Sequence, residues 1–256
     1  MESIDIGKYR GIVVLTGAGV SAASGIRTFR GKDGLWNDAT IARLSDIGTF
    51  RTEPLEVWKF WSAARAISAA AGPNAAHRAL AALEKRLRPD QRLTLITRNV
   101  DGLHRRAGSA NVIEYHGSVH RSRCSNGRCG LESFADSAVY ETEVPACPLC
   151  GSPLRPDIVF FGEMIPPDLE RAARAALDAC DLFIAAGTSG TVHPANGFVR
   201  HARDAGARTV LVNLEELEDG SPQFMEIHRG KAEELLPLLL GASGQEGRPP
   251  TSPRRP

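Results

Sequence analysis

Short apolar runs alternate with amphipathic segments along most of the chain. The apolar runs are rich in β-branched residues and occupy residues 11–16, 93–97, 111–115, 157–161, 181–187 and 208–213. The segments between them repeat their apolar residues at helical spacing, at 77–87, 166–180 and 196–206. Near-continuous apolar strands separated by helices are typical of a parallel sheet covered on both faces. The pattern therefore predicts an α/β fold with a doubly wound parallel sheet.

Two stretches interrupt this alternation. Residues 31–75 combine a polar, glycine-rich loop with short helices, and residues 119–156 contain four of the five cysteines among many Gly, Pro and Ser residues. We interpret the two stretches as a smaller domain, inserted into a sheet domain made of residues 1–30, 76–118 and 157–240. Residues 241–256 contain too few apolar side chains to pack and are predicted to form a disordered tail.

Composition limits where the protein works and what it binds. The chain has 256 residues, 42% of them hydrophobic, and 31 basic against 30 acidic residues, a net charge of +1. A balanced charge favours neither nucleic acid nor an anionic membrane, so we expect no direct nucleic-acid binding. The N-terminus lacks the features of a signal peptide, and no apolar run approaches the roughly 20 residues of a spanning helix. We expect a cytoplasmic protein, monomeric and without membrane association.

The first predicted strand continues directly into the glycine-rich sequence GAGVSAASGI. Gly17, Gly19 and Ala22 match the G-x-G-x-x-A fingerprint, whose small residues let the backbone approach a pyrophosphate at a helix N-terminus. A tight strand-to-helix connection without a ligand remains an alternative for this motif alone. In dehydrogenases an acidic residue follows about 20 positions further on, at the end of a second strand; here the chain enters the polar, glycine-rich loop SGIRTFRGKDGLW instead, and that strand with its acidic end is absent. The turn therefore indicates a dinucleotide site and gives no support to hydride transfer.

The cysteines form two pairs. Four residues separate Cys124 from Cys129, two separate Cys147 from Cys150, and 17 lie between the pairs. Such pairs typically supply four thiolates to a tetrahedral zinc ion, which leaves no position open for water or substrate and makes the ion structural. A redox-active CxxC and a nucleic-acid-binding zinc ribbon are the alternatives, and the turn-rich, charge-balanced surroundings favour neither. Cys180 is interpreted as a buried hydrophobic residue.

Several motifs occur in one order along about residues 11–240: GAGVSAASGIRTFRGKDGLW (17–36), PNAAH (73–77), RNVDGLH (98–104), HG (116–117), the cysteine pairs, RPDIVFFGE (155–163), GTSGTVHPA (187–195) and VNLE (212–215). In this order they resemble the sirtuins, NAD-dependent protein-lysine deacylases, and in particular the small bacterial and archaeal members. The resemblance implies a Rossmann-like NAD-binding domain, and a smaller domain formed by a helical module and a four-cysteine zinc module. It also implies NAD as co-substrate, structural Zn²⁺, and acyl-lysine proteins as substrates. The expected products are nicotinamide, O-acyl-ADP-ribose and free lysine.

The resemblance also assigns roles to individual residues. His116 matches the catalytic base that takes a proton from a ribose hydroxyl, and Asn99 and Asp101 match catalytic residues that hold the ribose and the nicotinamide carboxamide. A strand-end histidine bonded to a neighbouring carbonyl, and turn capping by Asn and Asp, are the structural alternatives.

Cofactor and substrate contacts are assigned in the same way. The expected cofactor contacts are Gly17, Ala18, Gly19, Ser21, Ser24, Ile26, Thr28, Phe29, Arg30, Trp36, Arg98, Asn99, Val100, Asp101, Gly187, Thr188, Ser189, Asn213, Leu214, Glu215 and Ala232. The expected substrate contacts are Trp61 and a segment that pairs with the peptide by strand addition: Val159, Phe160, Phe161, Gly162 and Glu163. The apolar character of that segment is equally compatible with a core strand.

Two positions bear on specificity. Sirtuins that favour malonyl or succinyl lysine carry a Tyr and, three residues later, an Arg; here Trp61 and Ala64 occupy these positions, and Arg65 lies about 100° further around the helix. We therefore predict acetyl over succinyl substrates, with longer apolar acyl chains as an alternative.

The family usually has Gln where this chain has Arg98, so Arg98→Gln is expected to alter the NAD Michaelis constant. Mono-ADP-ribosyl transfer to protein and a non-catalytic zinc-containing binding module are the competing functions.

Overall fold

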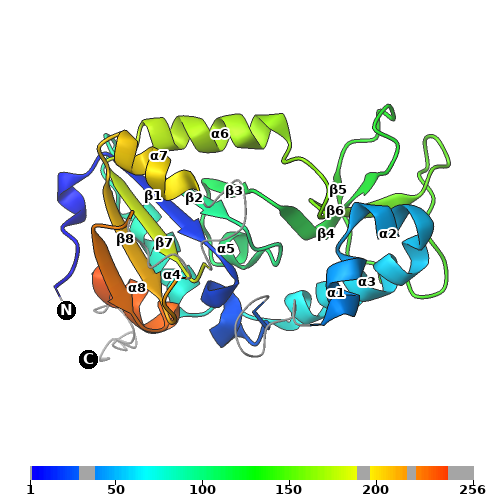
Figure 1. Cartoon of the computed structure of the whole chain (residues 1–256), viewed down its shortest axis with the longest axis horizontal. Coiled ribbons are helices and arrows are strands. Elements are labelled where there is room, and N and C mark those ends of the chain that lie inside the picture. Colours follow the sequence, from blue (N-terminus) through cyan, green and yellow to red (C-terminus); the bar gives the residue numbers. More distant parts are fainter. Residues whose placement is uncertain (1, 29–37, 189–196, 218–222, 242–256) are drawn as a thin grey trace, which may run out of the picture.

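The larger domain is built on a six-stranded parallel sheet. The computed structural model (Figure 1) describes residues 2–28, 38–188, 197–217 and 223–241, so the predicted tail lies outside the described residues except for Gly241. The strands are β1 (Gly11–Thr16), β2 (Arg92–Thr97), β3 (Val112–Glu114), β7 (Leu182–Ala186), β8 (Arg208–Asn213) and β9 (Glu226–Arg229). Their order is β3-β2-β1-β7-β8-β9, and every neighbouring pair is parallel. The predicted doubly wound sheet is confirmed, in the strand order of dinucleotide-binding folds.

Helices cover both faces of this sheet because its strands are apolar on both sides. Alternate residues of β1 enter different cores: Ile12 and Val14 join one cluster, and Val13 and Leu15 join the other. The first cluster includes leucines of α4 (Ala75–Lys85) and α8 (Ala232–Leu239). The second cluster includes buried apolar residues of α6 (Pro167–Asp178) and α7 (Phe198–Asp204). Short helical turns lie at η1 (Ile6–Lys8), η2 (Ala18–Ser24) and α5 (Leu103–Arg106).

One predicted strand belongs to a different sheet. The apolar run at 157–161 was expected in the parallel sheet, but the strand is β6 (Leu154–Ile158), which pairs antiparallel with β4 (Gly117–Cys124). With β5 (Phe134–Ala135) these strands form the three-stranded sheet of the smaller domain. The expectation was wrong because an apolar run reveals burial and does not reveal its partner. The sixth parallel strand is β9, whose sequence EIHR is too short and polar to be recognised.

The smaller domain packs helices against that second sheet (Figure 1). Its helices are α1 (Ala39–Leu44), α2 (Ile47–Thr52) and α3 (Pro54–Ala70), and Trp58 and Trp61 of α3 share a core with Ile158 and Phe160. The Trp58 indole N–H donates to the Leu154 carbonyl at 2.8 Å. The segment that leaves β6 is therefore anchored by its own hydrophobic core, which fixes it beside the edge of the larger domain.

Candidate active site

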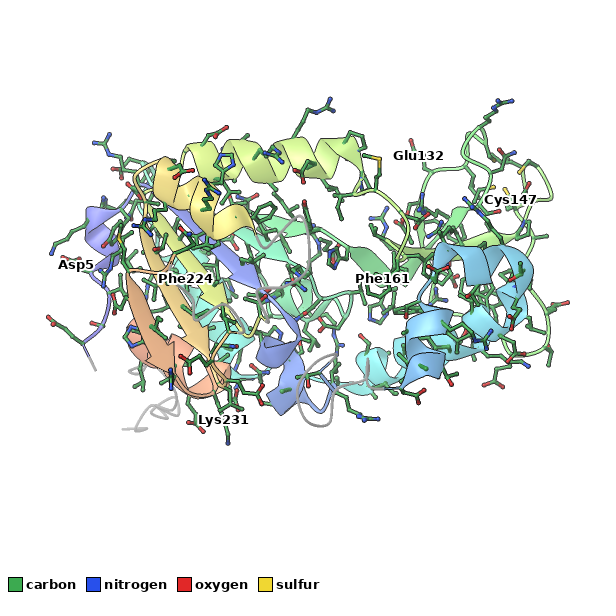
Figure 2. The ribbon with its side chains drawn as sticks, viewed as in Figure 1. Asp5, Glu132, Cys147, Phe161, Phe224 and Lys231 are labelled. Atoms are coloured by element: carbon green, nitrogen blue, oxygen red, sulfur yellow. The ribbon has the colours of Figure 1, made fainter. Side chains whose placement is uncertain are left out.

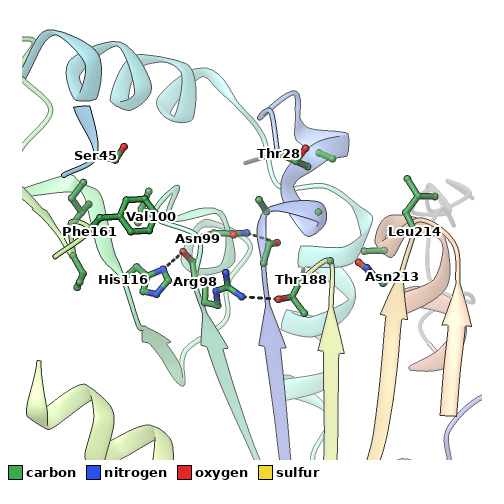
Figure 3. A pocket seen from close by; sticks show the side chains of 18 of the residues that line it. Thr28, Ser45, Arg98, Asn99, Val100, His116, Phe161, Thr188, Asn213 and Leu214 are labelled. Atoms are coloured by element: carbon green, nitrogen blue, oxygen red, sulfur yellow. Dashed lines mark hydrogen bonds between the residues drawn. The ribbon is translucent and has the colours of Figure 1, made fainter. Parts of the chain in front are cut away.

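A cavity of about 1000 Å³ lies at the carboxyl edge of the parallel sheet, where it meets the smaller domain. Its walls come from the ends of β1, β2, β7 and β8, from His116, from the residues after β6 and from the start of α8. Figure 3 shows His116 and Phe161 at one end, Asn213 and Leu214 at the other, and Arg98 and Thr188 between them. Sheets of this order bind ligands where the strand order reverses, here between β1 and β7.

The glycine turn forms the floor of that crevice. A Cβ on Gly19 would lie 2.7 Å from the Cα of Gly187, and a Cβ on Gly17 would lie 2.6 Å from the Gly187 carbonyl oxygen. Gly187 itself has a φ of +57°, and its Cβ would lie 2.5 Å from the Val20 nitrogen. The turns after β1 and β7 are thus packed backbone to backbone, which requires glycine at all three positions and leaves the crevice open to a ligand.

A buried polar network lies behind the turn. The Asn99 amide donates to the Gly17 carbonyl at 3.0 Å and to the Ser21 hydroxyl at 3.1 Å. The Ser21 hydroxyl donates to Asp101 Oδ2 at 2.7 Å, and Asp101 Oδ1 accepts the Leu103 N–H at 2.9 Å. Asp101 therefore also caps the turn after β2, and it lies behind the cavity wall that Asn99 helps to form. The network joins two predicted site segments that are about 80 residues apart.

Two further histidines support this network as neutral groups. The Asn74 N–H donates to His77 Nδ1 at 3.2 Å, and His104 Nε2 lies 2.9 Å from the Thr16 hydroxyl. Burial lowers the pKa of His77 to about 4 and that of His104 to about 3. Both side chains remain uncharged near neutral pH, which suits a structural role in the network.

His116 follows β3 and lines the cavity. Its Nδ1 lies 3.2 Å from the Arg98 carbonyl oxygen, which can only accept a hydrogen bond, so Nδ1 carries the proton and Nε2 has the lone pair (Figure 3). Burial, followed by the positive charge of Arg98, lowers the pKa of His116 to about 4. The imidazole is neutral at pH 7, the state that a general base requires.

The substrate end of the cavity is mainly apolar. Phe161 pairs with the smaller domain, because its N–H donates to the Ser45 carbonyl at 2.9 Å and its carbonyl accepts the Ile47 N–H at 3.0 Å. The Val159 N–H donates to the His116 carbonyl at 3.0 Å, so this segment also contacts the turn between β3 and β4 that carries the histidine. Strand addition of a peptide to 159–163 stays a prediction, and it would have to use backbone groups other than these.

An ion pair shapes the same wall. Arg155 donates to both carboxylate oxygens of Glu163 at 2.6 Å, and Glu163 Oε2 also accepts the Phe160 N–H at 2.9 Å. The guanidinium carbon of Arg155 lies 4.4 Å from the centre of the Phe160 ring. Glu163 is thus neutralised within the wall, which leaves the aromatic rings as its main surface.

The structure gathers most of the predicted site residues around the cavity. Predicted cofactor and catalytic residues that line it are Gly17, Ala18, Gly19, Thr28, Arg98, Asn99, Val100, His116, Gly187, Thr188, Asn213, Leu214, Glu215 and Ala232; all six predicted substrate residues line it too. Ser21, Ser24, Ile26 and Asp101 are outside the lining, and Phe29, Arg30, Trp36 and Ser189 lie outside the described residues. Lining residues that were not predicted include Ser45, Met164, Glu170, Gly230 and Lys231. Gly230 and Lys231 follow β9, so recognising that strand would have exposed them.

The four paired cysteines meet at the far end of the smaller domain, where Figure 2 labels Cys147. Their sulfur atoms all lie within 4.8 Å of one another, and the Cys124–Cys150 and Cys129–Cys147 pairs are 3.5 and 3.7 Å apart. Four thiolates around zinc, at Zn–S distances of 2.3 Å, place neighbouring sulfurs about 3.8 Å apart. The donor set and its spacing therefore fit the predicted structural zinc ion.

A search of the helices in the described part of the chain finds none with the length and apolar character of a membrane span.

Comparisons with known proteins agree with this site. The model of the Sir2 family matches residues 17–194. An NAD-dependent protein deacylase of Pasteurella multocida is 46% identical over 234 residues, 90% of this chain and 96% of the relative. NAD-dependent protein deacylase 1 of Archaeoglobus fulgidus is 42% identical over 240 residues, 94% of this chain and 95% of the relative.

Solved structures give the same result. A Sir2 homologue in complex with NAD has a TM-score of 0.84 at 39% identity and covers 94% of both chains. A Sir2 protein bound to acetylated peptide has a TM-score of 0.79 at 31% identity, with 93% of this chain and 95% of that chain covered. The predicted resemblance is confirmed: this chain belongs to the Sir2 family.

Proposed function

We propose that this protein removes acyl groups from protein lysines at the expense of NAD, giving nicotinamide, O-acyl-ADP-ribose and free lysine. One observation carries the proposal: a neutral imidazole lies in one cavity with a dinucleotide-type glycine turn and an apolar wall. The names of the relatives and the acetylated peptide and NAD complexes of the structural neighbours support the same reaction.

Each part of the cavity has a task in this reaction. The glycine turn admits the diphosphate, and Asn99 contacts the nicotinamide ribose. NAD supplies the reactive bond between ribose and nicotinamide, to which the acyl-lysine is delivered along the apolar wall. Nε2 of His116 accepts the proton of a ribose hydroxyl, with Nδ1–H fixed by the Arg98 carbonyl. The four cysteine thiolates would hold a zinc ion that stabilises the smaller domain and leaves no coordination position for the reaction.

The reaction is tested by incubating the protein with NAD and an acetyl-lysine peptide. We expect nicotinamide release that depends on the peptide, with O-acetyl-ADP-ribose and deacetylated peptide as the other products by mass spectrometry. ADP-ribose attached to protein would instead indicate ADP-ribosyl transfer, and an absence of nicotinamide release would indicate a non-catalytic module.

We further infer that the protein acts as a cytoplasmic monomer on acyl-lysine proteins.

We propose acetyl-lysine as the preferred substrate, because the described residues of the apolar wall include no lysine or arginine lining the cavity that could pair with the free carboxylate of a malonyl or succinyl group. The Trp61 indole N–H already donates to the Leu44 carbonyl at 3.0 Å, and Ala64 packs against the domain core. Arg65 is 2% exposed and bonded to the Val119 and Ala138 carbonyls, with Asp136 3.2 Å away. This arginine connects α3 to the zinc module and is not available to an acyl chain.

The preference is measured as kcat/KM on peptides that differ only in acetyl, butyryl, myristoyl or succinyl lysine. Succinyl should be at least about tenfold poorer than acetyl, because its carboxylate would be buried without a partner, which costs about 1–3 kcal/mol or more for a charged group. The double variant Trp61→Tyr/Ala64→Arg should recover part of the succinyl activity, whereas Trp61→Tyr/Ala64→Met, which has a long side chain without charge, should not. Succinyl as the best substrate of the unmodified protein would contradict the proposal.

A further inference from the structure

Arg98 connects three separate segments of the cavity wall. Its N–H donates to the Thr16 carbonyl at the end of β1 at 3.0 Å, and its carbonyl accepts the His116 Nδ1–H. Its guanidinium Nη1 donates to the Thr188 hydroxyl after β7 at 2.9 Å (Figure 3). The side chain therefore extends from the end of β2 across β1 to β7, and its charge is held at the crevice where the strand order reverses.

The position of this charge along the cavity matches the middle of a dinucleotide. His116 lies at one end and Asn213 at the other, with Arg98 and Thr188 between them (Figure 3). In NAD the diphosphate joins the nicotinamide ribose to the adenine ribose, so it occupies the middle of the bound molecule. Thr188 also adjoins the glycine turn, because its Cα lies 3.0 Å from the position that a Cβ on Gly17 would take.

Three of the other charged residues around the cavity have charged or polar side-chain neighbours, and the remaining two, Glu215 and Glu233, are acidic. Glu163 is bonded to Arg155, and Glu170 accepts hydrogen bonds from the Tyr115 hydroxyl and from Arg174 Nε. Lys231, the other lysine or arginine among the described lining residues, precedes α8 at the Asn213 end and lies 3.5 Å from Glu234. Among the described residues, Arg98 is therefore the cation that serves the centre of the cavity.

We propose that the Arg98 guanidinium pairs with the diphosphate of the dinucleotide across the β1–β7 crevice, while the Arg98 carbonyl positions the imidazole of His116. The inference rests on the proposed function, because that function makes NAD the ligand. A guanidinium has five N–H donors in a planar fork that suits phosphate oxygens, of which Thr188 takes one. Recognition of the cofactor and orientation of the base then depend on one residue.

The pairing has an electrostatic consequence for the base. Arg98 is the charged group that acts on His116 and lowers its pKa, after burial. The remaining acidic groups near that end of the cavity, Glu163 and Glu170, are the paired carboxylates described above. Removing the Arg98 charge should therefore raise the pKa of His116 toward its ordinary value, because a positive neighbour disfavours the imidazolium.

The test compares Arg98→Gln and Arg98→Lys with Arg171→Gln, a matched loss of charge at an exposed position on α6. Calorimetry with ADP-ribose, which retains the diphosphate and needs no acyl peptide, should show a Kd about 10- to 100-fold higher for Arg98→Gln. Arg98→Lys should recover part of this loss, since it keeps the charge without the fork, and Arg171→Gln should bind as the unmodified protein. The Kd should also depend less steeply on salt in Arg98→Gln.

Kinetics provide the second measurement. In Arg98→Gln the KM for NAD should rise while the KM for the acyl peptide stays unchanged, and the acid limb of the kcat/KM profile should move to higher pH. Unchanged ADP-ribose affinity, or an unchanged salt dependence, would overturn the inference; a thermal unfolding scan establishes that the variant is folded. If the unmodified protein binds ADP-ribose but releases no nicotinamide with any acyl peptide, the proposed function fails and the role of Arg98 stands.

Discussion

His116→Ala should lower kcat by about 10²- to 10⁴-fold, the usual contribution of a general base, and leave ADP-ribose binding nearly unchanged. The side chain lies at the edge of the cavity nearest the smaller domain, away from the Asn213 end where the adenosine half of the cofactor is expected (Figure 3). Binding of that half does not require the imidazole. The measurement is single-turnover nicotinamide release and product formation, beside calorimetry with ADP-ribose.

The matched control is His201→Ala. His201 lies on α7, where Nε2 contacts Asp178 at 2.6 Å, and it takes no part in lining the cavity. This variant should keep the full rate. An equal loss of rate in both variants, or a His116→Ala protein that still forms O-acyl-ADP-ribose at the unmodified rate, would contradict the assignment of His116 as the base.

The pH dependence follows from the same environment. Burial and Arg98 lower the pKa of His116 to about 4, so the neutral, active form is favoured above that pH and is lost as the pH falls through it. For the free protein, the limb of kcat/KM that His116 controls should therefore lie well below the 6.5 of an ordinary histidine. A limb near 6.5 in the unmodified protein, or a limb that does not move in the Arg98→Gln variant, would contradict this account of the site.

Cys147→Ser should cause the second large effect, loss of the zinc ion together with much of the order of the smaller domain. The cysteine is 3% exposed, and metal binding supplies folding free energy to modules with little regular structure. Between β4 and β6 the only strand in the described chain is the two-residue β5, so few ladder hydrogen bonds compensate for the metal. We expect a metal content far below one equivalent, and a midpoint of thermal unfolding lower by roughly 10 °C or more.

Activity should fall with the metal although zinc does no chemistry. β4 begins immediately after His116, and the Val159 N–H is bonded to the His116 carbonyl, so the second sheet supports both the base and the acyl-lysine wall. Cys180→Ala is the control, because Cys180 follows α6, is buried in a core of the larger domain and is not part of the cluster. It should keep a full equivalent of zinc by elemental analysis. Full zinc content in Cys147→Ser would contradict the four-thiolate site.

Local patterns in the sequence predicted much of this protein. The alternation of apolar runs and helical segments predicted five of the strands in the parallel sheet, because burial on both faces requires near-continuous apolar residues. The glycine turn and the cysteine pairs were also recognisable, since close backbone approach and tetrahedral thiolate binding each need particular residues at short spacing. His116 and Asn99 could be proposed only because the ordered motifs resemble a family, since neither residue is distinctive alone.

Which distant segments contact one another became clear only from the tertiary structure. The apolar character of the run at 157–161 predicted burial, but Asp157 and Ile158 pair with β4 in the second sheet, and Ile158 and Phe160 share a core with Trp58 and Trp61. Likewise, Arg65 looked like a neighbour of the acyl site and instead connects α3 to the zinc module.

The role of Arg98 shows the same division. The motif alone shows that a charged residue follows β2 among polar neighbours, and folding brings its guanidinium to Thr188, 90 residues further along the chain. Hydrophobic periodicity and motif spacing report what each short segment needs, namely burial, a tight turn or a metal. Which distant segment satisfies that need depends on how the two sheets pack, and that packing created both the cavity and the position of its central charge.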